Sequence, residues 1–253
     1  QIPCYNEAET LAVALGDLPR ALPGVASVEW LIVDDGSRDA TVEIARACGV
    51  DHIVRLPANR GLAEAWTAGI EACIALGADI IVHTDADNQY QAAAIPDLVA
   101  AVRAGADVAV GARPIAEIPH FSPVKKLLQR AGSAAMRRFS RTNVADAPSG
   151  FRAMRRETAL RLMVTTQYTY TLETLIHAGH AGLSVVNVPV GVNGDLRPSR
   201  LVKSIPSYVR RSLGTMVRVW LLYRGASLFA AMALLAGLGG LGAGVGALLG
   251  AGI

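Results

Sequence analysis

This 253-residue chain has only three cysteines and none of the patterns that bind zinc. Cys4, Cys48 and Cys73 lie far apart in the sequence, and no CxxC pair or His/Cys ligand spacing occurs. The cysteine usage therefore argues against a disulfide framework and against a zinc site. Reduced thiols in a cytosolic domain are expected instead.

The chain also lacks the common glycine-rich phosphate-binding motifs at the positions where such motifs bind nucleotides. No GxGxxG follows the first predicted strand, and GxxxxGK followed by Ser or Thr occurs nowhere. These motifs place backbone N–H groups against nucleotide phosphates. Their absence argues against a dinucleotide-dependent dehydrogenase and against a P-loop NTPase.

Acidic residues are absent from the last part of the chain. Residues 197–224 carry seven Lys and Arg side chains and no acid, whereas residues 225–253 carry no charge at all. Because the whole chain carries +3, residues 1–196 carry a net charge of −4. A basic segment directly before an apolar one predicts contact with an anionic membrane surface. The basic segment lacks interleaved aromatic side chains for stacking on bases, which argues against nucleic acid as a partner.

Short β-branched runs alternate with stretches of helical apolar spacing in the first half of the chain. We predict strands at 31–33, 52–54, 80–82 and 108–110, and helices at 7–18, 40–47, 62–76 and 95–104. This alternation predicts an α/β fold, Rossmann-like, with a mostly parallel sheet and helices on both faces. The chain begins inside a strand and ends in an apolar run, so we expect it to be a fragment of a longer protein.

Polar clusters follow the predicted strands, at the positions where parallel sheets bind ligands. The apolar run Ile80–Val82 leads into Asp85 and Asp87, which on an extended segment would point the same way. Two adjacent carboxylates repel each other unless a cation or a donor-rich ligand lies between them. Together with the amide oxygen of Gln89 they suit Mg²⁺ or Mn²⁺. The alternative is an acidic turn in which Asp85 caps the next helix.

The cluster Asp34-Asp35-Gly36-Ser37 has two readings as well. Asp and Ser after a strand form a good turn and helix start without any function. A carboxylate at this position could equally accept hydrogen bonds from a base N–H or from ribose hydroxyls. The cluster by itself does not separate these alternatives.

Several motifs together resemble family 2 glycosyltransferases with the GT-A fold. The matching segments occur in the family's order and spacing and are Ile2–Glu7 (IPCYNE), Val33–Ser37 (VDDGS), Asn59–Gly61 (NRG) and Asp85–Gln89 (DADNQ). Two later segments, Asp146–Arg152 (DAPSGFR) and Arg197–Leu201 (RPSRL), resemble the polyprenyl-phosphate branch, which includes dolichyl-phosphate mannose synthase. The resemblance covers nearly all of residues 1–224.

The resemblance implies an inverting enzyme that uses a nucleoside-diphosphate sugar, GDP- or UDP-linked. By this resemblance Asp35 would hold the base or ribose, Asp87 and Gln89 would bind the metal, and Asp85 would lie beside the diphosphate and the sugar. The rest of the predicted nucleotide-sugar site consists of Pro3, Tyr5, Glu7 and Ala86.

The same resemblance implies a group of side chains around an acceptor phosphate. Its members are Arg113, Lys125, Arg130, Ser133 and Arg200. A lipid phosphate has a second pKa near ~6, so at neutral pH it is already a nucleophilic anion. The reaction then needs charge neutralisation by metal and Arg or Lys rather than a strong base. We therefore assign catalytic roles to Asp85, Asp87, Arg113 and Arg130.

Other charged residues have a functional and a structural interpretation. Asp146 either positions the acceptor, as a further catalytic residue, or pairs with a nearby arginine. Glu173, at an apolar helix start, either reaches the substrate pocket or is a buried structural group. For Arg137, Arg138 and Arg141 we favour a solvated basic helix face. We expect His83, His177 and His180 to be structural.

The chain divides into three predicted parts, residues 1–196, 197–224 and 225–253. The first is the catalytic domain, and the second forms basic amphipathic helices that lie on a membrane or dock on the catalytic domain. The third would be a transmembrane helix, which we expect to be truncated, in the cell inner membrane. Its GxxxG spacings allow close helix contact and hence a homo-oligomer. The basic flank places the catalytic domain on the cytoplasmic side.

Three competing functions remain after this reading. The same fold could act on a glycan or protein acceptor, or the chain could be a non-catalytic membrane scaffold that binds a nucleotide sugar. A scaffold would be expected to lose the metal-binding residues, which are present here. A nucleotidyltransferase would need a glycine-rich loop containing Arg or Lys after the first strand, and Pro3–Glu7 is not such a loop.

Overall fold

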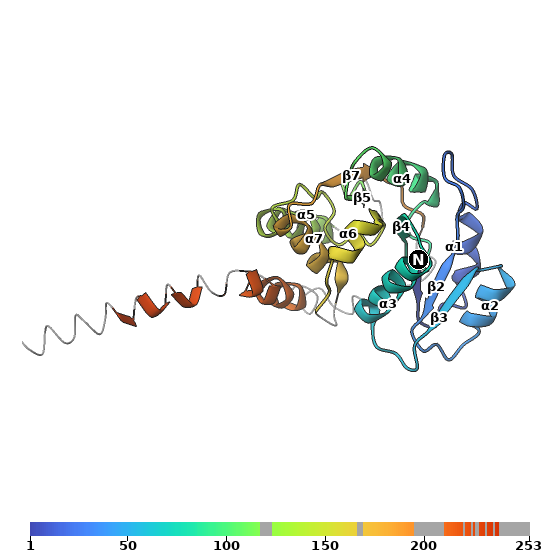
Figure 1. The fold of residues 1–253 in the computed structure, drawn as a ribbon, viewed down its shortest axis with the longest axis horizontal. Helices are drawn as coiled ribbons and strands as arrows, with labels where there is room; N and C mark the ends of the chain where they lie inside the picture. Colours follow the sequence, from blue (N-terminus) through green and yellow to red (C-terminus); the bar gives the residue numbers. More distant parts are fainter. Residues whose placement is uncertain are drawn as a thin grey trace, which may run out of the picture.

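The computed structural model describes residues 1–116, 123–165, 169–194, 210–219, 221–223, 225, 228–230, 232–234 and 236–237 (Figure 1). The strands of this part are β1 (Ile2–Cys4), β2 (Leu31–Asp34), β3 (His52–Arg55), β4 (Ile80–His83), β5 (Val108–Ala112), β6 (Arg152–Arg155) and β7 (Val185–Pro189). Its α-helices are α1 (Leu11–Asp17), α2 (Thr41–Ala47), α3 (Leu62–Ala75), α4 (Ile95–Arg103), α5 (Pro123–Ser140), α6 (Arg156–Arg161) and α7 (Tyr170–His180), with a 3₁₀ turn η1 (Ala92–Ala94) before α4.

The strands form two sheets that meet edge to edge. One sheet is parallel, in the order β1-β2-β3, and the other has the order β4-β6-β5-β7. Gln1 N donates to Val82 O at 2.6 Å and Gln1 O accepts from Thr84 N at 3.2 Å. This is the slanted pattern of parallel neighbours, so β1 lies beside β4. The expected α/β architecture with a parallel sheet is confirmed, with one antiparallel exception.

The exception is β6, which runs antiparallel between β4 and β5. Its register pairs Arg152 with His83 of β4 and with Val110 of β5. Because β6 runs in the opposite direction, it begins at the edge where β4 and β5 end. Residues 146–151, which precede β6, are therefore brought to that same edge. The sequence analysis did not predict this strand.

Helices cover both faces of the sheet and bury alternate residues of each strand. Val108 and Val110 pack in a core with residues of α3 and α7, whereas Ala109 packs with residues of α4. A third core joins β1 and β2 to α1 and α2. Full burial of one valine stabilises the fold by about 1.5–3 kcal/mol, so this alternation fixes the strand register. Figure 1 shows α3 on one side of the β1-β2-β3 sheet, and α1 and α2 on the other side.

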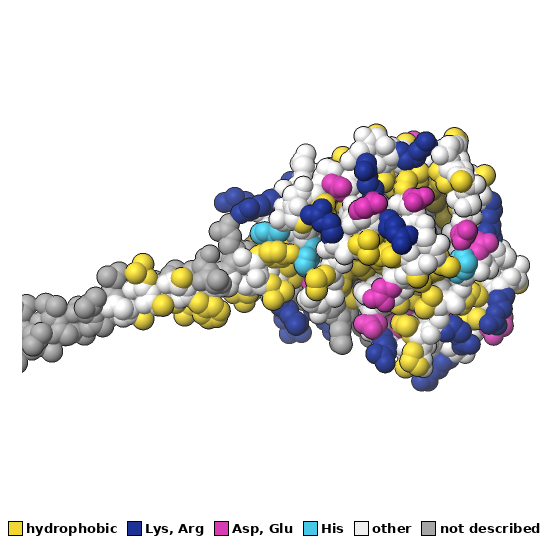
Figure 2. All heavy atoms as spheres, in the orientation of Figure 1, with side chains coloured by type: hydrophobic (Ala, Val, Ile, Leu, Met, Phe, Trp, Pro, Cys, Tyr) yellow, Lys and Arg dark blue, Asp and Glu magenta, His cyan; other side chains and the backbone are white. Residues whose placement is uncertain are grey.

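A helical stretch at residues 210–219 and 221–223 packs against α7. Met216 and Val219 are buried in the core that contains α7, and Tyr223 Oη lies 2.6 Å from His177 Nδ1. The other side of this stretch is exposed at Leu213 and Val217. Figure 2 shows apolar side chains along the surface of the C-terminal part.

The predicted transmembrane helix at 225–253 is not shown by the structure. Within the described residues, no single helix is long and apolar enough to cross a bilayer. Arg210–Tyr223 and Leu228–Leu234 satisfy the length and composition together, but the two are bent by 76°. Most of residues 225–253 lie outside the described part, and so do the GxxxG pairs between Gly240 and Gly250.

Candidate functional site

Loops from both sheets meet at the carboxyl edge of the strands, as expected for the ligand side of a parallel sheet. The loop after β1 is joined to the loop before α2 by backbone-to-side-chain hydrogen bonds. Asn6 N donates to Ser37 Oγ at 2.9 Å, and Glu7 N donates to Thr41 Oγ1 at 2.8 Å. The helix predicted from residue 7 begins at Leu11, whose N–H donates to Glu7 O at 2.9 Å.

The four predicted donor-site residues at the start of the chain and in the Asp85–Gln89 loop differ in exposure. Pro3 lies in buried β1, and Tyr5 is partly exposed at the end of that strand. Glu7 is buried, and its carboxylate accepts from Thr10 Oγ1 at 3.0 Å. Ala86 packs with residues of β1 in the core below the loop. Tyr5 is therefore the member of this group that presents its side chain most openly.

Asp35 holds the loop that follows β3. Its Oδ1 accepts from Arg60 N at 2.7 Å, and its Oδ2 accepts from Gly61 N and from Asn59 Nδ2, both at 2.9 Å. These bonds use three of the roughly four lone-pair positions of a carboxylate. Burial raises the pKa of the Asp35 carboxyl, and the N–H donors of Arg60 and Gly61 lower it in part. Asp35 thus fixes the 59–61 loop at this edge of the sheet.

Asp85 and Asp87 do not continue the extended backbone of β4. The chain turns at Ala86 and Asp87, because the Ala86 side chain packs into the core with residues of β1 and α1. The argument that alternate residues point the same way therefore does not apply to this pair. Asp87 Oδ1 accepts from Gln89 N at 3.1 Å, whereas Asp85 Oδ1 lies 3.5 Å from His83 Nε2.

A buried ion pair joins the Asp85–Gln89 loop to the end of β5. Arg113 Nε and Nη2 donate to the two carboxylate oxygens of Asp146 at 2.6 and 3.1 Å, and Nη1 donates to Gln89 Oε1 at 3.1 Å. The side chains of Arg113 and Asp146 are only 6% and 1% exposed. Burial by itself would lower the pKa of Arg113, but Tyr90 and Asp146 raise it, so the guanidinium stays charged. Asp146 is thus the partner of a nearby arginine.

The turn at 146–150 is held by a second arginine, Arg152, which is fully buried. Its guanidinium donates to the carbonyl oxygens of Ser149, Ala147 and Thr171 at 2.9–3.0 Å, and to Thr174 Oγ1 at 2.8 Å. Burial lowers the pKa of Arg152. All four acceptors are uncharged. The N–H groups of Arg152 therefore fix the direction of the chain before β6 and hold the start of α7.

Tyr90 closes the turn from the opposite side. Gly150 N donates to Tyr90 Oη at 3.1 Å, and the Tyr90 ring stacks on Phe151 at 5.1 Å between centroids. Burial raises the pKa of Tyr90 to about 12, so the phenol stays protonated at neutral pH. The Arg113 guanidinium carbon lies 5.5 Å from the centre of the same ring.

The predicted acceptor-phosphate residues are only partly brought together. Arg113 is at the site, and Ser133 on α5 is buried, where its Oγ accepts from Ala147 N at 3.2 Å. Arg130 lies one turn before Ser133 on α5 and is exposed. The side chain of Lys125 and the whole of Arg200 lie outside the described residues. Ser133 therefore holds the 146–150 turn, and Arg130 is an exposed cation one turn away on the same side of α5.

Other residues at the site were not identified as functional from the sequence. They are His83, Tyr90, Arg152 and Tyr170. His83 precedes Asp85 by two residues, a spacing that could have drawn attention to it. Arg152 lies inside the recognised segment Asp146–Arg152. Tyr90 and Tyr170 gave no such signal, because their partners are distant in the sequence.

The metal prediction fits the donor atoms at this edge. Among the described residues, no group of three or more His, Cys, Asp or Glu side chains could hold an ion alone. Asp87 and Gln89 nevertheless offer carboxylate and amide oxygens, which are hard donors. Mg²⁺ in proteins is commonly held by one or two carboxylates, with water and substrate phosphates completing its shell. Gln89 Oε1 also accepts from Arg113 Nη1 at 3.1 Å, so the amide oxygen is held at this edge.

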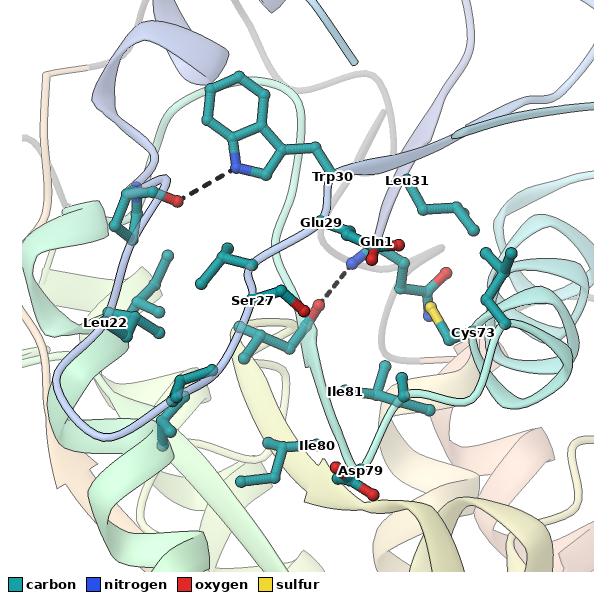
Figure 3. A pocket seen from close by; sticks show the side chains of 18 of the residues that line it. Gln1, Leu22, Ser27, Glu29, Trp30, Leu31, Cys73, Asp79, Ile80 and Ile81 are labelled. Carbon is teal, nitrogen blue, oxygen red and sulfur yellow. Dashed lines mark hydrogen bonds between the residues drawn. The ribbon is translucent and has the colours of Figure 1, made fainter. Parts of the chain in front are cut away.

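A cavity lies at the end of the sheet opposite to Asp146 and Arg113. A cavity of about 580 Å³ lies at the amino ends of β1, β2 and β4, lined among others by Gln1, Trp30 and Ile80 (Figure 3). The polar residues described above lie at the other ends of these strands. The cavity is therefore separate from the candidate site.

Known proteins similar to this chain are glycosyltransferases. The glycosyl transferase family 2 model matches residues 1–162. The polyprenol monophosphomannose synthase of Mycolicibacterium smegmatis is 30% identical over 200 residues, which are 75% of this chain and 74% of that protein. The undecaprenyl-phosphate mannosyltransferase of Micrococcus luteus is 31% identical over 199 residues, 75% of this chain and 80% of that protein.

The fold is also similar to that of a solved enzyme. A crystal structure of glucosyl-3-phosphoglycerate synthase from Mycobacterium tuberculosis, in complex with Mn²⁺, UDP and phosphoglyceric acid, superposes with a TM-score of 0.68. The match covers 87% of this chain and 76% of that one at 21% identity. A second complex of the same enzyme, with glucosyl-3-phosphoglycerate, gives a TM-score of 0.64. At this identity the similarity supports the α/β fold of GT-A type.

Proposed function

The chain belongs to glycosyl transferase family 2, in the branch similar to polyprenyl-phosphate mannose synthases, and on this premise we propose its reaction. It transfers a hexose, mannose by analogy with the names of its relatives, from a GDP- or UDP-sugar to a polyprenyl phosphate. The observation that carries the proposal is the hydrogen bond between Gln89 and Arg113. It joins the predicted metal motif to the predicted acceptor-phosphate cation, so the two reactants would meet across it.

The donor side supplies recognition of a nucleoside diphosphate sugar. Asp35 and the loop that it holds would face the nucleoside, and Asp85 would face the sugar. Asp87 and Gln89 would hold Mg²⁺ or Mn²⁺, which when bound supplies positive charge to the leaving diphosphate. The solved structures of the glucosyl-3-phosphoglycerate synthase contain Mn²⁺ and UDP, which supports this use of the fold.

The acceptor side supplies a fixed cation. Asp146 and Gln89 take three of the five N–H groups of Arg113 and hold its guanidinium in one orientation. The remaining N–H groups would bind the acceptor phosphate, with Arg130 as a second cation from α5. A phosphomonoester with a pKa near ~6 is already an anion at neutral pH. Its oxygen would attack the anomeric carbon in line with the departing diphosphate, which inverts the configuration.

The proposed location is the cytoplasmic face of the cell inner membrane. In the helical stretch that begins at Arg210, Met216 and Val219 are buried against the core while Leu213, Val217 and Leu221 are exposed. The exposed residues recur every four positions and form one apolar stripe. Arg210 lies on the same face one turn before Leu213, and Arg211 and Arg218 lie beside the stripe. Docking on the enzyme and contact with a lipid surface are thus compatible in one helix.

The test is a panel of nucleotide sugars with undecaprenyl and dolichyl phosphates, with and without Mn²⁺, analysed by lipid mass spectrometry. A phosphate-linked glycolipid is expected, and Asp87→Ala should reduce its formation by about 10²–10³-fold, as for lost transition-state charge stabilisation. Asp97→Ala, an exposed carboxylate in the first turn of α4, is the matched control and should leave the rate unchanged.

Other outcomes would identify the competing functions. Full activity of Asp87→Ala would contradict the site assignment. Sugar found only in a water-soluble polymer or in protein would favour a glycan or protein acceptor. Binding of nucleoside diphosphate without transfer from any donor would favour a non-catalytic scaffold.

A further inference from the structure

The first two turns of α5 present apolar side chains to the outside of the molecule. Val124, Leu127 and Leu128 are 60%, 68% and 37% exposed. They are spaced i, i+3 and i+4 and therefore share one face of the helix. The opposite face is buried at Ser133 and Met136. The exposed group is thus not part of the packing that holds α5 on the domain, and such a group on a surface indicates a contact with a partner.

The charge of α5 indicates what kind of partner this is. The helix has basic side chains and no Asp or Glu, its basic residues being Lys125, Lys126, Arg130, Arg137 and Arg138. Of these, Arg130 and Arg138 are exposed. On an anionic lipid surface, apolar side chains enter the boundary between headgroups and acyl chains, and cations contact the headgroups. Both properties of α5 therefore fit such a surface.

The C-terminal helical stretch at 210–219 and 221–223 has the same combination of an exposed apolar stripe and arginines. It is attached to the same part of the domain, because Met136 of α5, Leu175 of α7 and Met216 of the stretch belong to one core. Figure 1 shows α5 and the stretch at the same end of the molecule, and α1 and α2 at the other end. One extended surface can contact both helices, which favours a bilayer over a small protein partner.

We propose that the first two turns of α5 rest on an anionic lipid bilayer, as a second contact beside the C-terminal helical stretch. The inference rests on the proposed function, which places the enzyme at a membrane. Leu127 would enter the lipid boundary, and Arg130, one turn later, would lie near the headgroups. Ser133, which holds the 146–150 turn, is about 9 Å from Leu127 along the helix axis. The helix thus joins the lipid surface to the candidate site.

Quenching of a fluorescent label by lipid tests this contact. The full chain carries Cys48→Ser, because Cys48 is partly exposed whereas Cys4 and Cys73 are buried. Leu127→Cys is labelled with NBD in vesicles of phosphatidylcholine and phosphatidylglycerol that contain a nitroxide-labelled lipid. The matched control is Val13→Cys, an apolar residue on α1 that is 49% exposed. We expect most of the fluorescence at position 127 to be quenched and almost none at position 13.

A third label separates this inference from the proposed function. Val217→Cys, on the exposed side of the C-terminal helical stretch, reports the proposed membrane location by itself. Quenching at 217 but not at 127 would overturn the second contact and leave the location intact, whereas no quenching at either position would contradict both. Equal quenching at 127 and 13 would indicate non-specific adsorption and would also overturn the proposal.

Two further results would identify another partner or another attraction. A label at position 127 with blue-shifted emission but no quenching would be covered by protein, either a second copy or a different chain, and would overturn the proposal. Quenching at 127 should weaken in vesicles of phosphatidylcholine alone, and equal quenching there would contradict the preference for anionic lipid. None of these measurements needs sugar transfer, so absence of turnover would count against the proposed reaction alone.

Discussion

The candidate site has a donor half, which contains Asp34 and Asp35, and an acceptor half, which contains Arg113 and Arg152. The side chains that hold the two halves have opposite charge. In the donor half, carboxylates accept backbone N–H groups: Asp34 from Ser37, and Asp35 from Arg60 and Gly61. In the acceptor half, arginines donate instead, Arg113 to a carboxylate and Arg152 mainly to backbone carbonyls. The loops of the donor half are therefore shaped around negative charge and those of the acceptor half around positive charge. This difference fits the proposal that metal and diphosphate bind on one side and a bare phosphate on the other.

The two halves also differ in how far their partners lie apart in the fold. The donor loops use partners from neighbouring parallel strands. The acceptor half joins β5, the antiparallel β6 and α7 through two buried guanidinium groups. A buried cation tolerates little displacement, because lost hydrogen bonds are not replaced by water. We therefore expect the acceptor half to respond to substitution through stability and the donor half through substrate binding.

Replacement of Arg152 by methionine should have the largest effect. The carbonyl groups of Ala147, Ser149 and Thr171 would lose their donor, and each unpaired buried group costs about 1–3 kcal/mol. The free energy of unfolding should fall by about 3 kcal/mol or more, measured by urea denaturation. Arg55→Met is the matched control in the donor half, since the Arg55 side chain is 59% exposed. Its partner Asp34 is buried but still accepts from Ser37 N at 2.9 Å, so Arg55→Met should cost less than Arg152→Met, which leaves three carbonyl groups without a donor. Equal losses of unfolding free energy in Arg152→Met and Arg55→Met would contradict the expected difference between the two halves.

Asp35→Asn should have an intermediate effect that is confined to the donor. An amide has one acceptor oxygen, so its NH₂ group would face the N–H donors that Asp35 now receives. The KM for the nucleotide sugar should rise about tenfold, equivalent to one lost hydrogen bond. The KM for polyprenyl phosphate should stay the same. A parallel rise in both constants would show that the two halves are not separate.

The smallest expected effect concerns the packing of the helical stretch at 210–219 and 221–223 against α7. This stretch extends the acceptor half. Burial lowers the pKa of His177 from its usual 6.5, so the docked state favours the neutral ring, whose Nδ1 can accept from Tyr223 Oη. As pH falls below 6.5, the undocked His177 takes up a proton that the docked form does not, and docking is weakened. The loss is complete once pH passes below the lowered pKa.

Hydrogen exchange of the amides at 210–219 measures this docking. Exchange should be faster at pH 5.5 than at pH 7.5, after correction for the intrinsic rate. His177→Gln should remove most of the difference. His180→Gln is the control variant, because the ring of His180 also stacks on that of Tyr223. It shows whether His180, rather than His177, causes the pH dependence. An unchanged pH dependence in His177→Gln would assign the effect to another group.

The same contrast explains how much the sequence could predict. Strands β2 to β5 and helices α2 to α4 lie within about two residues of their expected bounds, because apolar periodicity is a local signal. The donor loops follow those strands directly and were located with them. The turn at Ala86 and Asp87 was misjudged, because it depends on a core contact with distant residues. That the Asp85–Gln89 loop is joined to Arg113 could not be read from spacing.

The acceptor half was harder to predict because its contacts are not local. The direction of β6 is not encoded in periodicity, and Arg152–Arg155 has no β-branched residue. Arg152 resembles a surface residue in the sequence, yet it is buried among acceptors 3 to 22 residues away. Asp146 was correctly given an arginine partner as one alternative, but the sequence did not say which arginine. The partner is Arg113, 33 residues earlier.

Helix α7 has a further consequence as a spacer of fixed length. Tyr170, at its start, reaches His83, and Thr174 receives a hydrogen bond from Arg152. His177, seven residues after Tyr170, contacts Tyr223 of the C-terminal helical stretch. A helix rises 1.5 Å per residue, so about 10 Å separates the two attachment points. With that stretch on a lipid surface, α7 would set the height of the reaction centre above the bilayer, and hence how far a lipid phosphate must rise to react.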